Sequence, residues 1–154
     1  LLSLLETELP SFYAHPHNTV DNEVALHQLA VELYRRQSVS NEEFLAKVIP
    51  LSEWTVIHIE ALEHKHPVYP TVLTELIVFY SSLENYGKAI FNGEKLSAYA
   101  LQTGDEETQI YSSLFLSRAY SKIGQQEQKD SCINSVSHLP QFKAIYEEVK
   151  DMLN

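Results

Sequence analysis

Two cations, Arg118 and Lys122, lie one helical turn apart in a chain that has 21 acidic and 11 basic residues. On a helix, a four-residue spacing places both side chains on one face. A guanidinium can bind a carboxylate through two parallel hydrogen bonds, so this pair could hold the carboxylate of a peptide. Tyr111, two turns earlier, would lie on the same face. The alternative is a pair of solvated side chains that interact with Glu106 or Glu107.

The histidines raise the question of a metal site. His64 and His66 are two residues apart, with His58 before them. On a helix their side chains would point about 200° apart, so they could share a metal only where the helix has unwound before Pro67. The histidines of the predicted loop His15-Pro16-His17 have no obvious third ligand, and the zinc-protease signature His-Glu-x-x-His is absent. We therefore expect solvated histidines, no metal and no other cofactor.

The sequence contains no recognisable set of residues for covalent catalysis. There is no Gly-x-Ser-x-Gly motif, no phosphate-binding glycine loop and no dinucleotide fingerprint. Cys132 lies on a predicted helix, where a cysteine more often fills a small core position than acts as a nucleophile. We expect a non-catalytic protein. The alternative of a metal-dependent helical enzyme depends on the histidines alone.

Charge and composition limit the partners of the chain. A formal charge of −10 would repel a phosphate backbone, so we expect no direct nucleic acid contact, and a peptide or protein partner fits better. No apolar run reaches the ~18 residues of a membrane span. The single Cys132 excludes an internal disulfide framework and favours a cytoplasmic protein. Because the only methionine is Met152, we expect that an N-terminal portion precedes this fragment.

A repeat with an offset of 40 residues would position the candidate side chains. When Tyr80 is aligned with Tyr120, Leu76 falls on Leu116. Each copy has a helical run, a short break (Asn85-Tyr86-Gly87 or Gly124-Gln125) and a second helical run, which is typical of stacked helix pairs. The prediction is one all-α, right-handed helical-repeat domain of about eight to nine helices over residues 1–154. It has degenerate helices in 1–69, two clearer units in 70–140 and a capping helix in 141–154.

Capping and breaking residues predict where the helices begin and end. A first helix would cover Leu1–Tyr13. Asp21 or Asn22 would cap a helix to about Gln37, Ser40 or Asn41 a helix from Glu42 to Ile49, and Pro50 would end that helix before another begins at Ser52. Lys65 and its neighbours would lie at the end of that helix, where the helix dipole favours cations. Gly104 would be a left-handed C-cap, and Asp105 the next N-cap.

Helical spacing of apolar residues predicts the buried face of each helix. The expected stripes are Leu26, Leu29, Ala30 and Leu33; Trp54, Ile57, Ala61 and Leu62; Leu73, Leu76, Tyr80 and Leu83 with Ala89, Ile90, Leu96 and Tyr99; Leu116, Ala119, Tyr120 and Ile123 with Ile133 and Val136; and Phe142, Ile145, Val149 and Leu153. An acidic outer face (Glu147, Glu148 and Asp151) would suit the closing helix.

The two units resemble tetratricopeptide repeats. Matching positions are Leu73, Leu76, Tyr80, Leu83, Tyr86 and Ala89 in one unit and Leu116, Tyr120, Ile123 and Gly124 in the other, whereas Ile77, Ser117 and Gly93 depart from the pattern. The long unit and the Thr103-Gly104-Asp105 junction are similar to the repeats of a group of Firmicutes peptide-responsive regulators, namely Rap, NprR, PlcR, PrgX and Rgg.

The resemblance implies a concave groove lined by the first helix of each pair. Its groove-facing positions are Thr74, Val78, Ser81 and Ser82, then Tyr111, Leu114, Arg118, Ser121 and Lys122, with His27, Val31 and Tyr34 from an earlier helix. It also implies a peptide-binding sensor and dimerisation domain of a transcriptional regulator, in which the peptide shifts the array between curvatures. The alternative is a chaperone- or secretion-type adaptor. A homodimer is compatible with either function.

Overall fold

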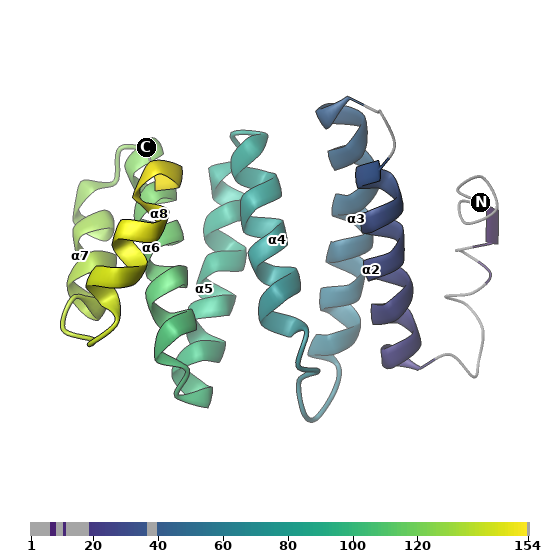
Figure 1. Ribbon diagram of the computed structural model, residues 1–154, viewed down its shortest axis with the longest axis horizontal. Coiled ribbons are helices and arrows are strands. Elements are labelled where there is room, and N and C mark those ends of the chain that lie inside the picture. Colours follow the sequence, from purple (N-terminus) through teal and green to yellow (C-terminus); the bar gives the residue numbers. More distant parts are fainter. Residues whose placement is uncertain (1–6, 9–10, 12–18, 37–39, 154) are drawn as a thin grey trace. The chain divides into compact units, whose positions relative to one another are not determined.

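The computed structural model describes residues 7–8, 11, 19–36 and 40–153, with the backbone alone at 152–153. In these ranges the chain forms seven helices and no strand, which confirms the all-α class (Figure 1). The helices are α2 (Val20–Arg36), α3 (Asn41–Glu60), α4 (Tyr69–Ser82), α5 (Tyr86–Thr103), α6 (Glu106–Lys122), α7 (Gln126–Val136) and α8 (Phe142–Leu153). Most of the predicted helix 1–13, and the histidines at 15 and 17, lie outside the described residues.

The chain divides into two compact units, residues 1–72 and 73–154, with the boundary inside α4. In the first unit, α2 packs against α3. The cap of α2 is Thr19 and not Asp21 or Asn22, because the Asn22 amide donates to Thr19 Oγ1 at 3.3 Å. Ser40 caps α3 as expected, since its Oγ accepts from the Glu43 amide at 3.2 Å. Whether the chain behaves as one domain stays a prediction.

Pro50 does not end a helix, contrary to expectation, and α3 continues through it to Glu60. A proline inside a helix leaves the carbonyl four residues earlier without its partner. Here that residue is Ala46, and both Ala46 and Pro50 are exposed, so solvent can reach the carbonyl. One buried stripe continues on both sides of Pro50, formed by Leu45, Val48, Ile49, Ser52, Thr55, Val56 and Ile59. Burial of this continuous face outweighs the lost hydrogen bond.

The predicted stripes of α2 and α3 are displaced by about one residue position, although Ala30 is buried as predicted. Leu29 is 49% exposed and Ile57 is 63% exposed. The buried residues of α2 are instead Glu23, Val24, His27, Ala30, Val31 and Tyr34. Most of these residues are apolar, but Glu23 and His27 are polar and interrupt the hydrophobic pattern in the sequence. Lys65 does cap the end of α3, since its ammonium donates to the carbonyls of Glu60 (2.8 Å) and Leu62 (3.1 Å).

The two segments related by the 40-residue offset have the same turn between their helices. The Asn85 amide donates to Tyr80 O, and the Gln125 amide donates to Tyr120 O, both at 2.9 Å. The residue before each donor has a left-handed backbone, Glu84 with φ 56° and Gly124 with φ 77°. The first break therefore lies at 83–85 and not at 85–87, because Tyr86 and Gly87 already belong to α5.

The junction between the two copies forms as the sequence predicts. Gly104 ends α5 with φ 70°, and its amide and that of Asp105 donate to carbonyls of the last turn. Asp105 caps α6 by accepting from the Thr108 amide at 3.0 Å and from the Thr108 hydroxyl at 2.7 Å. These hydrogen bonds to the ionised form lower the pKa of Asp105.

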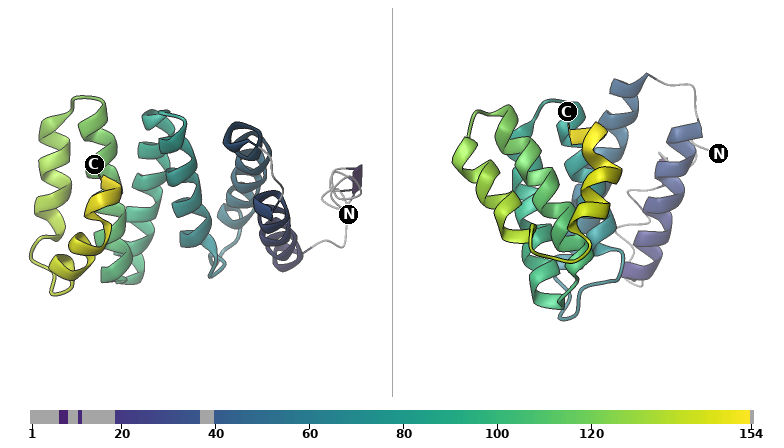
Figure 2. Two further views of the ribbon diagram at one scale, coloured as in Figure 1. Left: turned by 45° about the horizontal axis from the view of Figure 1, so that its top comes forward. Right: turned by 60° about the vertical axis from the view of Figure 1, so that its left-hand side comes forward.

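In the second unit, α6 contacts α5, α7 and α8 (Figure 2). A close approach at Gly93 brings α5 and α6 together, because a Cβ added there would lie 2.8 Å from Leu116 Cδ2. The core beside α8 consists of Ile110, Leu114, Val136, Ile145 and Val149. The predicted stripe residues Leu83 and Ile123 are 47% and 44% exposed, since both follow the last residue of their helices.

Candidate functional site

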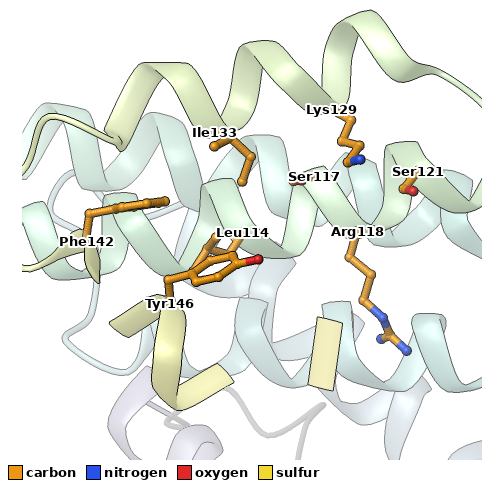
Figure 3. Close-up of a pocket in the computed structure, with 8 residues that line it drawn as sticks. All are labelled: Leu114, Ser117, Arg118, Ser121, Lys129, Ile133, Phe142 and Tyr146. Atoms are coloured by element: carbon orange, nitrogen blue, oxygen red, sulfur yellow. The ribbon is translucent and has the colours of Figure 1, made fainter. Parts of the chain in front are cut away.

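A pocket of about 380 Å³ lies among α6, α7 and α8 (Figure 3). This volume is at the lower end of the range for ligand sites. Its lining residues are Leu114, Ser117, Arg118, Ser121, Lys129, Ile133, Phe142 and Tyr146. They form four pairs with a spacing of four residues, 114/118, 117/121, 129/133 and 142/146. This spacing places each pair on one face of its helix, so all three helices present a continuous face to the pocket.

The apolar part of the pocket comes from all three helices. Leu114 is 1% exposed and belongs to the core, so it forms the floor. Phe142 and Tyr146 stack with ring centroids 5.8 Å apart, and Tyr146 is 39% exposed. Ile133 extends from α7 toward the same space (Figure 3). The exposed Tyr146 ring therefore gives a ligand an aromatic surface at the rim.

The charged lining residues of the pocket are both cations, Arg118 on α6 and Lys129 on α7. Arg118 Nε is buried and has no hydrogen-bond partner among the described residues. In Figure 3, Lys129 extends from α7 toward α6, whereas Arg118 extends from α6 away from α7. Ser117 and Ser121, also on α6, contribute small hydroxyl side chains that leave room and can donate hydrogen bonds. The Lys129 ammonium and these two hydroxyls suit an anionic group.

Contacts with α6 hold α8 beside the pocket. Ile145 and Val149 are buried in the cluster that contains Ile110 and Leu114. At the edge of this contact the Tyr111 hydroxyl donates to Glu148 Oε2 at 3.4 Å. Burial, followed by the negative charges of Glu148 and Glu107, raises the pKa of Tyr111. The hydroxyl therefore stays protonated at neutral pH and keeps its proton for this bond.

The structure brings together three of the predicted site residues, Leu114, Arg118 and Ser121, in one pocket. Tyr111 lies beside them, but it packs on the core cluster and bonds to α8. Lys122 is exposed and is not a lining residue of the pocket. The remaining predicted positions are on α4, where Thr74 and Ser81 are half-buried and Val78 and Ser82 are exposed. Whether any of these residues binds a partner stays a prediction.

Three further positions that the resemblance assigned to the groove are in the core instead. His27, Val31 and Tyr34 are only 1%, 4% and 5% exposed. They lie on the face of α2 that is buried, because the stripe of this helix is rotated relative to the predicted one. They cannot present side chains to a ligand in this structure.

The sequence interpretation missed five lining residues, Ser117, Lys129, Ile133, Phe142 and Tyr146. The apolar spacing in the sequence places Ile133 and Phe142 in buried stripes, and Lys129 carries no signal of its own. The available signal was the four-residue spacing on each helix, but that spacing does not indicate which helices meet. The pocket depends on how α8 packs against α6, which is a tertiary contact.

The described residues contain no group of three or more metal-binding side chains. His64 and His66 come after α3 has ended, and His66 Nε2 lies 3.0 Å from Asp21 Oδ1. None of the described helices combines the length and apolar character needed to span a membrane. In comparisons with known proteins, no family model, no curated protein and no solved structure matches this chain.

Proposed function

We propose that this chain is a non-catalytic helical-repeat domain that binds a peptide or protein partner, and that the pocket among α6, α7 and α8 holds part of that partner. The observation that carries the proposal is the composition of the pocket. Two cations and two hydroxyls line one part, and Ile133 with a stacked aromatic pair lines another. A peptide carries both charged and apolar groups along one chain.

Charge supports the pocket as a binding site. In a chain with a formal charge of −10, neither Arg118 nor Lys129 forms an ion pair with a carboxylate of the described residues. By contrast, Arg35 and Arg36 both pair with Glu32 on the surface of α2. A cation that is partly buried and unpaired loses contact with water and gains no charged partner in return. An anionic ligand would supply that partner.

The finer proposal is the sensor and dimerisation part of a peptide-responsive transcriptional regulator. It is supported by the 40-residue repeat with its shared turn and by the junction at Gly104 and Asp105. A sensor of this kind should change its oligomeric state when peptide binds, which sedimentation velocity measures. An adaptor or scaffold, the alternative, should bind its partner with an unchanged oligomeric state.

The test of peptide binding is selection from a displayed random heptapeptide library, followed by fluorescence polarisation with the selected peptides. We expect micromolar binding that protects amides of α6 and α8 from hydrogen exchange. Tyr146→Ala should weaken binding by about tenfold, since an aromatic contact contributes roughly 1–2 kcal/mol. Phe91→Ala is the matched control, because Phe91 is also an exposed aromatic, 57% accessible, on α5 outside the pocket.

Two outcomes would refute the proposal. One is a selection that enriches no peptide over scrambled sequences. The other is a set of selected peptides that bind the Tyr146→Ala and Phe91→Ala variants as tightly as the unmodified protein, because the binding surface would then lie outside the pocket.

A further inference from the structure

We infer that the outer face of α2 is the interface of a homodimer, in which α2 of one protomer packs antiparallel on α2 of its partner. The centre of this interface is a leucine seam, formed by Leu26, Leu29 and Leu33. The inference concerns a different surface from the pocket among α6, α7 and α8, and it does not rest on the proposed function.

The leucine seam is an apolar face of α2 that the fold leaves partly exposed. Its three residues recur at intervals of three and four, so they lie along one side of the helix. Leu29 is 49% exposed, and Leu26 and Leu33 are half-buried. The helix packs against α3, and its buried face contains Val31 and Tyr34 instead. The seam therefore has the spacing of a helix–helix contact on a side of α2 that is still accessible.

The charges at the two ends of α2 identify a second molecule of this chain as the partner. In the first turn the Asp21 side chain is 83% exposed. In the last turn Arg35 and Arg36 share the single carboxylate of Glu32, at 3.4 and 2.6 Å, so this end keeps a net positive charge. An antiparallel partner places its positive end beside the negative end of the first protomer, and two-fold symmetry repeats the contact at the other end. A parallel partner would bring the two positive ends together.

The register of the seam agrees with this pairing. Leu29 is its middle residue, so a two-fold axis at Leu29 is the arrangement that buries all three leucines. Asn22 and Arg36 are each seven residues from Leu29 and therefore face each other across the axis. Asp21 adjoins Asn22, which brings its carboxylate next to the partner's Arg36. Leucine contacts in the centre and opposite charges at both ends thus come from one geometry.

The size of the surface predicts a weak, reversible dimer. A helix of 17 residues is about 25 Å long, and one pair of such helices buries less than the roughly 1,000 Å² that stable interfaces exceed. The formal charge of −10 on each protomer also opposes association. We expect a dissociation constant on the order of 10–100 µM.

Sedimentation velocity of the full chain, from about 5 to about 500 µM, measures the dimer. Leu29→Glu should weaken dimerisation at least about tenfold, because the change acts in both protomers and replaces an apolar group with a charge. Leu101→Glu is the matched control and should leave the dimer unchanged, because Leu101 is 67% exposed on α5, outside the seam. Circular dichroism at 222 nm shows that each variant is folded.

Charge reversal tests the antiparallel arrangement. Asp21→Arg and Arg36→Asp should each weaken the dimer about three- to tenfold, because each exposed ion pair occurs twice in the symmetric dimer. The double variant should regain most of the lost affinity, since each protomer again has two complementary ends. His66→Ala is the control for the contact of 3.0 Å between His66 Nε2 and Asp21 Oδ1, and it should not change dimerisation.

Three results would overturn the inference. One is a protein that stays monomeric up to about 500 µM, above the expected dissociation constant. If Leu29→Glu then also lowers the urea midpoint much more than Leu101→Glu does, another part of the same chain covers the seam. The second is a dimer that Leu29→Glu leaves intact. The third is a double charge reversal that weakens the dimer more than either single change, because the two ends would then not face each other.

Discussion

Substitutions of the left-handed residue in two equivalent turns should change the stability of the protein in opposite directions. Glu84 has φ 56° in the first repeat copy, and Gly124 has φ 77° in the second. Both turns carry the same backbone hydrogen bonds, at 3.1 Å from the left-handed residue and at 2.9 Å from the next. Glycine adopts this conformation without a steric penalty, whereas a residue with a Cβ does not. Glu84→Gly should therefore stabilise the protein, and Gly124→Ala should destabilise it.

The expected magnitude is about 0.5–1 kcal/mol for each change. A left-handed conformation costs a non-glycine residue about 1–2 kcal/mol. The greater freedom of glycine in the unfolded chain offsets about 0.4–1 kcal/mol of this. No contact complicates either site: Glu84 is exposed, and a Cβ at Gly124 would have no atom within 4 Å. The net effect is therefore that of the backbone alone.

Urea unfolding followed by circular dichroism at 222 nm measures these changes as shifts in midpoint at constant slope. Gly87→Ala is the control, because Gly87 lies in the first turn of α5 with only Asn85 Oδ1 within 4.0 Å of an added Cβ. That substitution should stabilise by up to about 1 kcal/mol through helix propensity. The reasoning is refuted if Gly124→Ala stabilises as Gly87→Ala does, or if Glu84→Gly lowers the midpoint.

Three further predictions concern the contacts among α5, α6 and α7. Gly93→Ala should cost about 1–3 kcal/mol, because the new Cβ would meet Leu116 Cδ2 at 2.8 Å, and adding Leu116→Ala should cost less than the sum of the single changes. Burial and then the hydrogen bond to Glu94 (2.9 Å) raise the pKa of Tyr120 to about 12. The stability from this shift should be complete below pH 10 and lost between pH 10 and about 12, as alkaline unfolding and tyrosinate absorbance will show. Burial first, and then Glu94, also raise the pKa of Cys132, so the thiol should react slowly at pH 8 and faster after Glu94→Gln, as a colorimetric thiol assay will report.

The features that the sequence predicted correctly are controlled by neighbours in the chain. Ser40, Gly104 and Asp105 cap their helices because a short side-chain oxygen or a missing Cβ acts within a few residues. The error at Pro50 has the opposite origin. A local rule ends a helix there, but burial of one continuous face across the proline decides the outcome.

The pocket residues that the sequence predicted all lie on one helix, α6. Leu114, Arg118 and Ser121 follow from the periodicity of α6, and they do line the pocket. Lys129 and Tyr146 come from two other helices, and their approach to α6 depends on packing that no local pattern encodes. Similarly, His27 is buried because neighbouring apolar residues determine which face of α2 packs.

The pocket lies where the second of the two offset segments packs differently from the first. With the 40-residue offset, Ile133 is equivalent to Gly93, and Gly93 is covered by the Leu116 side chain from the next helix. In the second copy the following helix is α8, which packs through Ile145 and Val149 on the Ile110 and Leu114 part of α6. Ile133 is not covered in the same way and lines the pocket. Because the equivalent place at Gly93 is filled by the Leu116 side chain, the space beside Ile133 suits an apolar side chain.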